Sequence, residues 1–246
     1  MPEPILAVRA LTKRYEGLVA LSAVDFEVAR GEIFGVIGPN GAGKTTLFSC
    51  LVGAVAPTSG TIRFRGERID GRPNHAVVAR GLVRTHQIVR PFKEMTVDQN
   101  VSIGADFGAG PRRREARRER VRELLEKTSL LHRAEALAGT LTIGELKRLE
   151  IARALATEPE VLCLDEVMGG LNPSEIREAM KLILSIRDSG TTVLMIEHHV
   201  HAVVGISDRI LVLNFGRRIA EGTPSEVMRH PEVVKAYLGE EIVESV

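Results

Sequence analysis

The sequence has almost no net charge and no long apolar run. With 33 Lys and Arg against 32 Asp and Glu, the formal charge is +1, so no global field recruits nucleic acid or an anionic membrane, and a local patch would have to attract either partner. No stretch reaches the roughly 18 apolar residues that span a bilayer, and the N-terminus lacks a basic segment followed by an apolar core. We therefore expect a chain that is not exported and does not itself cross a membrane.

Cysteine is scarce as well, since the chain has only two. Cys50 falls in an expected helix and Cys163 inside an apolar strand, so we expect two buried thiols, no disulfide and a reduced, intracellular protein. A chain of 246 residues can bury roughly three quarters of its extended surface. This length predicts one α/β domain with a satellite subdomain.

The most informative stretch that is present matches the phosphate-binding pattern G-x-x-x-x-G-K-[ST]. It follows the apolar, strand-like run 33–37 and precedes a helical stretch, 46–52, which is the context that such a loop requires. The glycines let successive N–H groups point inward, Lys44 adds positive charge for the outer phosphates, and Thr45 supplies a hydroxyl for Mg²⁺. An ordinary glycine-rich turn is the alternative. The pattern predicts a nucleoside triphosphate site made by Gly38, Pro39, Asn40, Gly41, Ala42, Gly43, Lys44, Thr45 and Thr46.

Two adjacent carboxylates follow a second apolar run, residues 161–164. In folds with this kind of loop, the carboxyl ends of neighbouring parallel strands meet at one edge of the sheet, so Asp165 and Glu166 are expected beside Lys44. We assign Asp165 to Mg²⁺, which it would hold through water, and Glu166 to the attacking water. The alternative is that two acids simply follow a strand in a turn.

The periodicity of apolar residues changes along the chain. Short β segments before residue 37 predict an antiparallel patch that leads into a central sheet. From Pro111 to about Thr157 apolar residues recur at three and four, which is typical of two or more helices. The runs at 161–164 and 191–196 are typical of parallel strands buried on both faces, with a crossover helix between them over 174–187.

The last strand is expected at Ile210 to Phe215, before a turn and a polar helix from about Ser225. The predicted fold class is α/β, a mostly parallel sheet with an antiparallel β subdomain and a helical subdomain. The predicted division of the single domain 1–246 is a catalytic core with its β subdomain over 1–90 and 158–224, a helical subdomain over 91–157 and a C-terminal helical tail over 225–246.

The order of these motifs resembles that of ABC transporter ATPases, which have a phosphate-loop NTPase core, and the likeness covers nearly the whole chain. The resemblance implies that Tyr15 stacks on adenine, that Gln87 reaches the metal and the water, and that His198 hydrogen-bonds the γ-phosphate. A packed edge-strand tyrosine is the alternative for Tyr15. A metal cluster with His199 and His201 is the alternative for His198, but their spacing on a strand end and the lack of nearby ligands argue against it.

The family's Leu-Ser-Gly-Gly-Gln segment corresponds to residues 141–145, directly before a helical run. In the family this segment faces the γ-phosphate held by the other subunit, and a helix N-terminus with a hydroxyl suits an anion. Here Ile143 replaces a glycine and Glu145 replaces the glutamine. Because a carboxylate near a triphosphate is unfavourable unless it points away, we assign the contact to Thr142 and Gly144.

Residues 112–123 hold seven arginines and three glutamates. Such a basic run invites a nucleic-acid interpretation. Against it, glutamates recur every four residues among the arginines, as on a solvated, ion-paired helix face, and no interleaved aromatic residue offers base stacking. We favour the solvated face over lipid headgroups or nucleic acid.

Several blocks further resemble the larger ATPase subunit of bacterial branched-chain amino acid importers: residues 83–87, 91–97, 149–155, 166–173 and 231–239. This implies a cytoplasmic subunit on the inner face of the cell membrane, docked on two integral-membrane permease subunits. A sister ATPase or a second copy would complete the dimer, an extracytoplasmic protein would capture the solute, and no nucleic acid is expected. The solute itself does not follow, because the ATPase never touches it. The alternative is a soluble ABC-type ATPase that clamps nucleic acid or ribosomes, although such proteins usually carry two cassettes or long coiled-coil insertions.

The resemblance also implies a mechanism with ATP and Mg²⁺ as cofactors. Two ATP molecules would be sandwiched between two subunits, and closure of this dimer would drive the permease. Glu166 and His198 would then position water for attack on the γ-phosphate, which resets the cycle. The expected metal ligands are Thr45, Gln87 and Asp165, and the phosphate contacts are Lys44, Thr45 and Gln87 from one subunit with Thr142 and Gly144 from the other.

Overall fold

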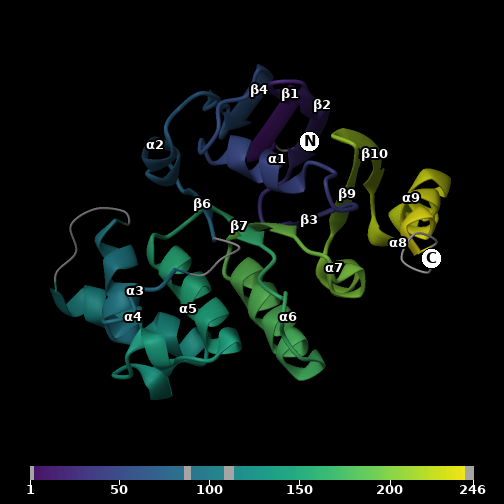
Figure 1. Cartoon of the computed structure of the whole chain (residues 1–246). Helices are drawn as coiled ribbons and strands as arrows, with labels where there is room; N and C mark the ends of the chain where they lie inside the picture. Colours follow the sequence, from purple (N-terminus) through teal and green to yellow (C-terminus); the bar gives the residue numbers. More distant parts are fainter. Residues whose placement is uncertain (1–2, 86–89, 108–113, 242–246) are drawn as a thin grey trace.

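A computed structural model describes residues 3–85, 90–107 and 114–241 (Figure 1). Its strands are β1 Leu6–Tyr15, β2 Leu18–Val28, β3 Ile33–Ile37, β4 Ser59–Phe64, β5 Glu67–Arg68, β6 Leu82–Arg84, β7 Val161–Asp165, β8 Thr192–Ile196, β9 Arg209–Asn214 and β10 Arg217–Gly222. Its helices are α1 Lys44–Leu51, α2 Asn74–Val78, α3 Val97–Asp106, α4 Arg114–Lys127, α5 Ile143–Ala156, α6 Pro173–Asp188, α7 Val200–Ile206, α8 Pro224–Met228 and α9 Pro231–Glu241, with 3-10 turns at Leu131–Arg133 and Ala138–Thr140. Of these described helices, none is long and apolar enough to cross a bilayer.

The central sheet has six strands in the order β10-β9-β3-β8-β7-β6. The strands from β9 to β6 run parallel, and β10 is antiparallel to β9. Every residue of β3, β7 and β8 is buried, as their continuous apolar sequences predict for strands covered on both faces. The sheet therefore brings the ends of β3, β7 and β8 to one edge, where the phosphate loop, Glu166 and Glu197 follow them.

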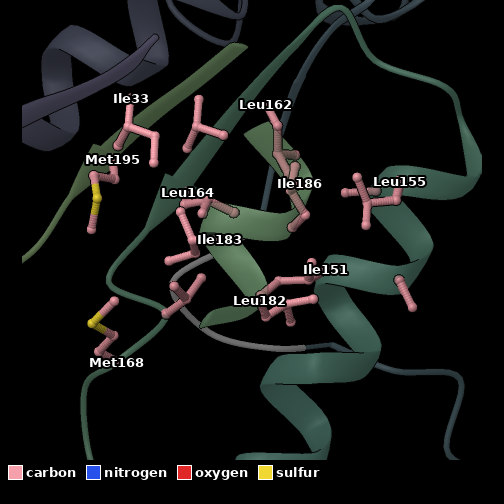
Figure 2. Packing of buried hydrophobic residues seen from close by; sticks show 14 of the residues in the cluster. Ile33, Ile151, Leu155, Leu162, Leu164, Met168, Leu182, Ile183, Ile186 and Met195 are labelled. Carbon is pink, nitrogen blue, oxygen red and sulfur yellow. The ribbon is translucent and has the colours of Figure 1, made fainter. Parts of the chain in front are cut away.

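Alternate residues of β7 point into two different cores. Leu162 and Leu164 pack with the apolar faces of α5 and α6, including Ile151 and Ile183 (Figure 2). Cys163, on the opposite face, belongs to a core made by α1 and the antiparallel sheet. This alternation follows from the two-residue period of a strand, and it fixes the sheet between two apolar layers.

The antiparallel sheet has four strands in the order β2-β1-β4-β5 and covers α1 (Figure 1). It accounts for the β patch predicted before the phosphate loop. Both cysteines are buried and free, and burial raises the pKa of the Cys50 thiol to about 11 and that of Cys163 to about 12. The prediction of two buried thiols without a disulfide is confirmed.

Two of the predicted elements differ from the structure. Helical structure begins before Pro111, because α3 starts at Val97 with a capping box in which Thr96 Oγ1 accepts from the Gln99 amide at 3.2 Å. The strand expected at Ile210 to Phe215 is not the last, since β10 pairs antiparallel with β9 after a turn at Phe215. β10 is an edge strand with only Ala220 buried, so it lacks the apolar alternation that would have revealed it.

Candidate functional site

The phosphate loop joins β3 to α1 and leaves no room for side chains at two of its glycines. Gly43 caps α1 with φ +100°, and a Cβ there would lie 2.5 Å from the Ala20 carbonyl oxygen. At Gly38, φ is +150° and a Cβ would lie 2.1 Å from the Leu213 carbonyl oxygen. Only glycine fits both the backbone conformation and the space, which explains why the motif needs these residues at these positions.

Lys44 is the first residue of α1, directly after the loop, and is only 5% exposed. Its ammonium group donates to the carbonyl oxygens of Gly38 at 2.5 Å and Pro39 at 2.9 Å. The positive charge is thus held over the loop, where the N-terminus of α1 also favours an anion.

A cavity of about 490 Å³ opens beside the loop. It is lined by the loop residues from Asn40 to Thr46 together with Tyr15, Glu166, His198 and others. The structure therefore brings most of the predicted site residues to one place, although they come from β1, the β3–α1 loop and the ends of β7 and β8.

Two aromatic residues that are far apart in the sequence, Tyr15 and Phe215, border this cavity. Tyr15 ends β1, is 42% exposed and has the Lys13 ammonium 4.8 Å from its ring centre. An exposed ring at the cavity edge suits contact with a base better than a packed edge-strand role. Phe215, in the β9–β10 turn, is 84% exposed and also lines the cavity. The sequence analysis placed Phe215 at the end of an expected strand and gave it no site role, because a phenylalanine at a strand end carries no motif.

Asp165 ends β7 with its carboxylate buried. Its Oδ2 accepts from Arg84 Nη2, at the end of the adjacent strand β6, and its amide donates to Thr85 Oγ1 at 3.1 Å. Its Oδ1 is buried without a hydrogen-bond partner among the described residues. A buried carboxylate oxygen with spare capacity is the kind of group that accepts from a metal-bound water, so the residues present fit Mg²⁺.

Arg84 is therefore a site residue that the sequence analysis missed. It also donates to Ser49 Oγ at 3.0 Å, and its guanidinium lies 5.8 Å from the ring of Phe48. Because Arg84 is registered with Cys163 in the parallel sheet, it lies next to Asp165 only once β6 and β7 have paired. Gln87, three residues further on, is in a part of the chain outside the described residues.

Glu166 and His198 meet across the ends of β7 and β8. Glu166 Oε1 lies 2.8 Å from His198 Nε2, and the Glu166 amide donates to the Ile196 carbonyl at 2.9 Å. The backbone of Glu166 has φ +52°, a left-handed conformation that is uncommon for residues other than glycine. A carboxylate paired with an imidazole at the mouth of a phosphate site is suited to orient a water molecule and take its proton. His199, by contrast, precedes α7 as its N-terminal boundary residue, and the described part of the chain holds no cluster of three or more metal-ligating side chains.

A further carboxylate, Glu197, lies between the end of β8 and His198 and is only 2% exposed. Its Oε1 accepts from the Met168 amide at 2.7 Å, while its Oε2 has no partner among the described residues. Burial raises the pKa of Glu197 to about 7, against the opposing effects of the Met168 hydrogen bond and the charge of Lys147.

Thr142 and Gly144 lie at the start of α5 and do not line the cavity beside the phosphate loop. Thr142 is the N-cap of the helix, and its Oγ1 accepts from the Glu145 amide at 3.3 Å. Glu145 Oε2 in turn accepts from the Thr142 amide at 2.8 Å, and Oε1 lies 3.4 Å from Arg133 Nε. The acid thus turns back onto its own helix, while Ile143 is 62% exposed.

Gly144 is buried against the start of α6. A Cβ at this position would lie 2.8 Å from Glu175 Oε1. Within one subunit, Gly144 thus lies close to the end of the Glu175 side chain. Gly144 does not line the nucleotide cavity of its own subunit, so the phosphate contact that the sequence analysis assigned to it would have to involve another subunit.

The sequence matches two family models. The ABC transporter model matches residues 21–169, and the model described as branched-chain amino acid ATP-binding cassette transporter matches residues 217–243. Among curated relatives, the chain is similar to the high-affinity branched-chain amino acid transport ATP-binding proteins LivG of Salmonella typhimurium and BraF of Pseudomonas aeruginosa. Each is 44% identical over 98% of this chain and 100% of the relative.

Another relative has a different cargo in its name. The lipopolysaccharide export system ATP-binding protein LptB of Escherichia coli is 35% identical over 96% of this chain and 98% of its own length.

Solved structures agree with the fold. The ADP conformation of an ATP-binding cassette of an ABC transporter superposes with a TM-score of 0.88 at 31% identity, over 96% of this chain and 99% of that one. A nucleotide-free cassette has a TM-score of 0.87 at the same identity and the same coverage. The predicted α/β fold with its antiparallel β and helical parts is therefore confirmed, and the chain belongs to the ABC transporter family as an ATP-binding ATPase that resembles LivG and BraF.

Proposed function

We propose that this chain is the ATPase subunit of a membrane importer for branched-chain amino acids or related amino-acid-like solutes. The observation that carries the proposal is that Lys44 and the Glu166–His198 pair line one cavity, at the sheet edge where Asp165 ends β7. The names of LivG and BraF and the family model at the C-terminus support this class of solute.

In the proposed reaction, the site residues divide between binding the nucleotide and activating the attacking water. Tyr15 contacts the adenine, and Lys44 with the amides of residues 38–46 binds the β- and γ-phosphates. Mg²⁺, when bound, neutralises charge on these phosphates; Thr45 would hold it, with Asp165 through water and Gln87. Glu166 takes a proton from the attacking water, and His198 orients the Glu166 carboxylate and hydrogen-bonds the γ-phosphate.

The start of α5 has a role in a second subunit's site under this proposal. Thr142 and Gly144 lie away from the chain's own cavity, so they would serve a nucleotide held by a facing copy or a sister ATPase. ATP binding would close this dimer and move two permease subunits at the inner face of the cell membrane, with an extracytoplasmic binding protein delivering the solute. Hydrolysis would remove the phosphate that bridges the halves.

The test of the chemistry is Glu166→Gln. The variant should still bind MgATP and accumulate as an ATP-bound dimer in gel filtration, while kcat falls by about 10²- to 10⁴-fold because the base is lost. Glu178→Gln is the matched control, since Glu178 is exposed and pairs only with Lys181 among the described residues. Undiminished turnover in Glu166→Gln would refute the assignment of Glu166.

The test of the class of partner is affinity purification from mild detergent. The proposal expects two multispanning proteins and a second ATPase, and uptake of a radiolabelled branched-chain amino acid that depends on this chain. Recovery of ribosomes or nucleic acid without membrane proteins would favour the soluble alternative instead.

A further inference from the structure

A lysine on α5 reaches the backbone of the proposed catalytic base. Lys147 Nζ donates to the carbonyl oxygen of Glu166 at 2.6 Å. Lys147 lies one turn after Gly144, on the helix whose first residues are the half-site assigned to another subunit's nucleotide. One side chain therefore joins that half-site to the chain's own hydrolytic centre.

Glu166 needs such support because of its conformation. With φ +52°, its backbone adopts a conformation that persists only when the surroundings hold it. Its amide is held by Ile196, on β8, and its carbonyl accepts from Lys147 and from the Gly169 amide at 3.3 Å. Of these three hydrogen bonds, only the one from Lys147 comes from a side chain and from α5.

The same lysine lies among acidic groups. The Lys147 ammonium interacts favourably with the charges of Glu197, Glu166 and Asp165, although burial lowers its pKa overall. Glu197 anchors the next part of the loop, since it accepts from the Met168 amide. Removing the ammonium would increase the repulsion between these carboxylates, and it would remove the hydrogen bond from Lys147 to the Glu166 carbonyl.

We propose that Lys147 is a positioning residue for ATP hydrolysis, which fixes the Glu166 backbone so that its carboxylate meets His198 and which couples the start of α5 to that carboxylate. The proposal rests on the proposed role of Glu166. Lys147 touches neither nucleotide nor water in this role. Its effect passes through one carbonyl oxygen and the three acids around it.

The test compares two half-buried lysines that both donate to carbonyl oxygens. Lys127 Nζ donates to the Ser185 carbonyl at 3.1 Å and to Ser189 Oγ at 2.8 Å, between α4 and the end of α6, and burial lowers its pKa as well. Lys127→Met is therefore a matched control for Lys147→Met. It removes the same kind of bond at a place that does not line the nucleotide cavity.

Lys147→Met should lower kcat on the order of 10- to 100-fold, the usual cost of misplacing a catalytic group through its supporting residues. KM for ATP and binding of a fluorescent ATP analogue should change by less than about twofold, because ground-state contacts remain. Lys147→Arg should recover part of kcat, and Lys127→Met should keep kcat near wild type at an equal loss of Tm. Added to Glu166→Gln, the Lys147→Met change should have little further effect on kcat, since both act through one carboxylate.

Three results would overturn the proposal: wild-type kcat in Lys147→Met, a loss confined to KM, or equal losses of kcat in both methionine variants. If Lys147→Met does not fold, Lys147→Gln replaces it, since it keeps an N–H donor without the charge, and its kcat must still lie below that of Lys147→Arg. Glu166→Gln separates the two proposals. If it is inactive while Lys147→Met is fully active, only the positioning role fails, whereas full activity of Glu166→Gln refutes the role of Glu166 itself.

Discussion

The acid at the start of α5 provides a sharp test of how this chain tolerates a carboxylate in the segment that we propose to face a phosphate of another subunit. Glu145 accepts from the Thr142 amide and pairs with Arg133, so its charge is directed back along its own helix. Partial burial acts to raise its pKa, but the hydrogen bonds from Thr142 and the charge of Arg133 outweigh this, and the pKa of Glu145 is lowered. We expect Glu145→Gln to leave ATP affinity unchanged, because glutamine can keep the same capping bond.

The two possible orientations differ by a measurable amount. A carboxylate about 5 Å from a phosphate charge, at an effective dielectric constant near 20, would repel it by roughly 3 kcal/mol. Neutralising such a group would tighten ATP binding on the order of 100-fold. A group turned away and paired with Arg133 should instead change affinity by less than about threefold, and the lost, partly exposed ion pair should cost about 0–1 kcal/mol of stability.

Affinity is best measured by titrating a fluorescent ATP analogue into Glu166→Gln protein with and without the Glu145→Gln change. Glu226 is the matched control, since it forms the same kind of capping box with Thr223 at the start of α8. Glu145→Ala, which removes the cap, should lower the free energy of unfolding by about 1 kcal/mol, or Tm by about 2–4 °C. Because folding lowers the pKa of Glu145, its stabilisation is present above the ordinary carboxyl pKa and is lost as the pH falls through the folded value. An affinity gain of about 30-fold or more in Glu145→Gln but not in Glu226→Gln would refute the turned-back orientation.

Two further predictions concern buried charges at the sheet edge. Arg84→Met should destabilise the protein by about 3–5 kcal/mol in urea unfolding, because it leaves the buried Asp165 carboxylate without its cation, and Arg84→Lys should lose less; a midpoint equal to wild type would contradict this. Burial raises the pKa of Glu197 to about 7, so the folded protein binds this proton more tightly than the unfolded chain does. The stabilisation from the bound proton is fully present below the ordinary carboxyl pKa, and it is lost as the pH rises through about 7. The free energy of unfolding should fall by about 3 kcal/mol over this range. Tm measured from pH 5 to pH 8 should therefore fall in wild type relative to Glu197→Gln. Parallel profiles of the two proteins would count against a raised pKa of Glu197.

Local sequence was sufficient wherever a motif has its whole cause within a few residues. The phosphate loop is such a case, since the glycines at 38 and 43 are required by their own backbone angles, φ +150° and φ +100°. Asp165 and Glu166, at the carboxyl end of β7, are another, because a continuous apolar run predicts a buried parallel strand with its carboxyl end at the site.

What the sequence missed depends on register and on contacts between distant elements. Arg84 is unremarkable until β6 pairs with β7 and places it beside Asp165. Lys147 and Glu197 are 50 residues apart, and only the packing of α5 against the sheet brings both to the loop after Glu166. The start of α3 could have been found, however, because Thr96 and Gln99 have the spacing of a capping box.

The departures of residues 141–145 from the family's Leu-Ser-Gly-Gly-Gln segment are consistent with a stable start of α5. Ile143 is the first residue of α5 and has no positive φ, so no glycine is needed there for backbone reasons. Glutamate three residues after an N-cap threonine is favoured both by the capping box and by the helix dipole. The two substitutions therefore preserve the helix start while an apolar side chain faces outward and the acid faces back. In the dimer that we propose, the groups left to contact a phosphate of the other subunit would be the Thr142 hydroxyl and the first amides of α5, and Lys147 would transmit the position of that same helix to Glu166.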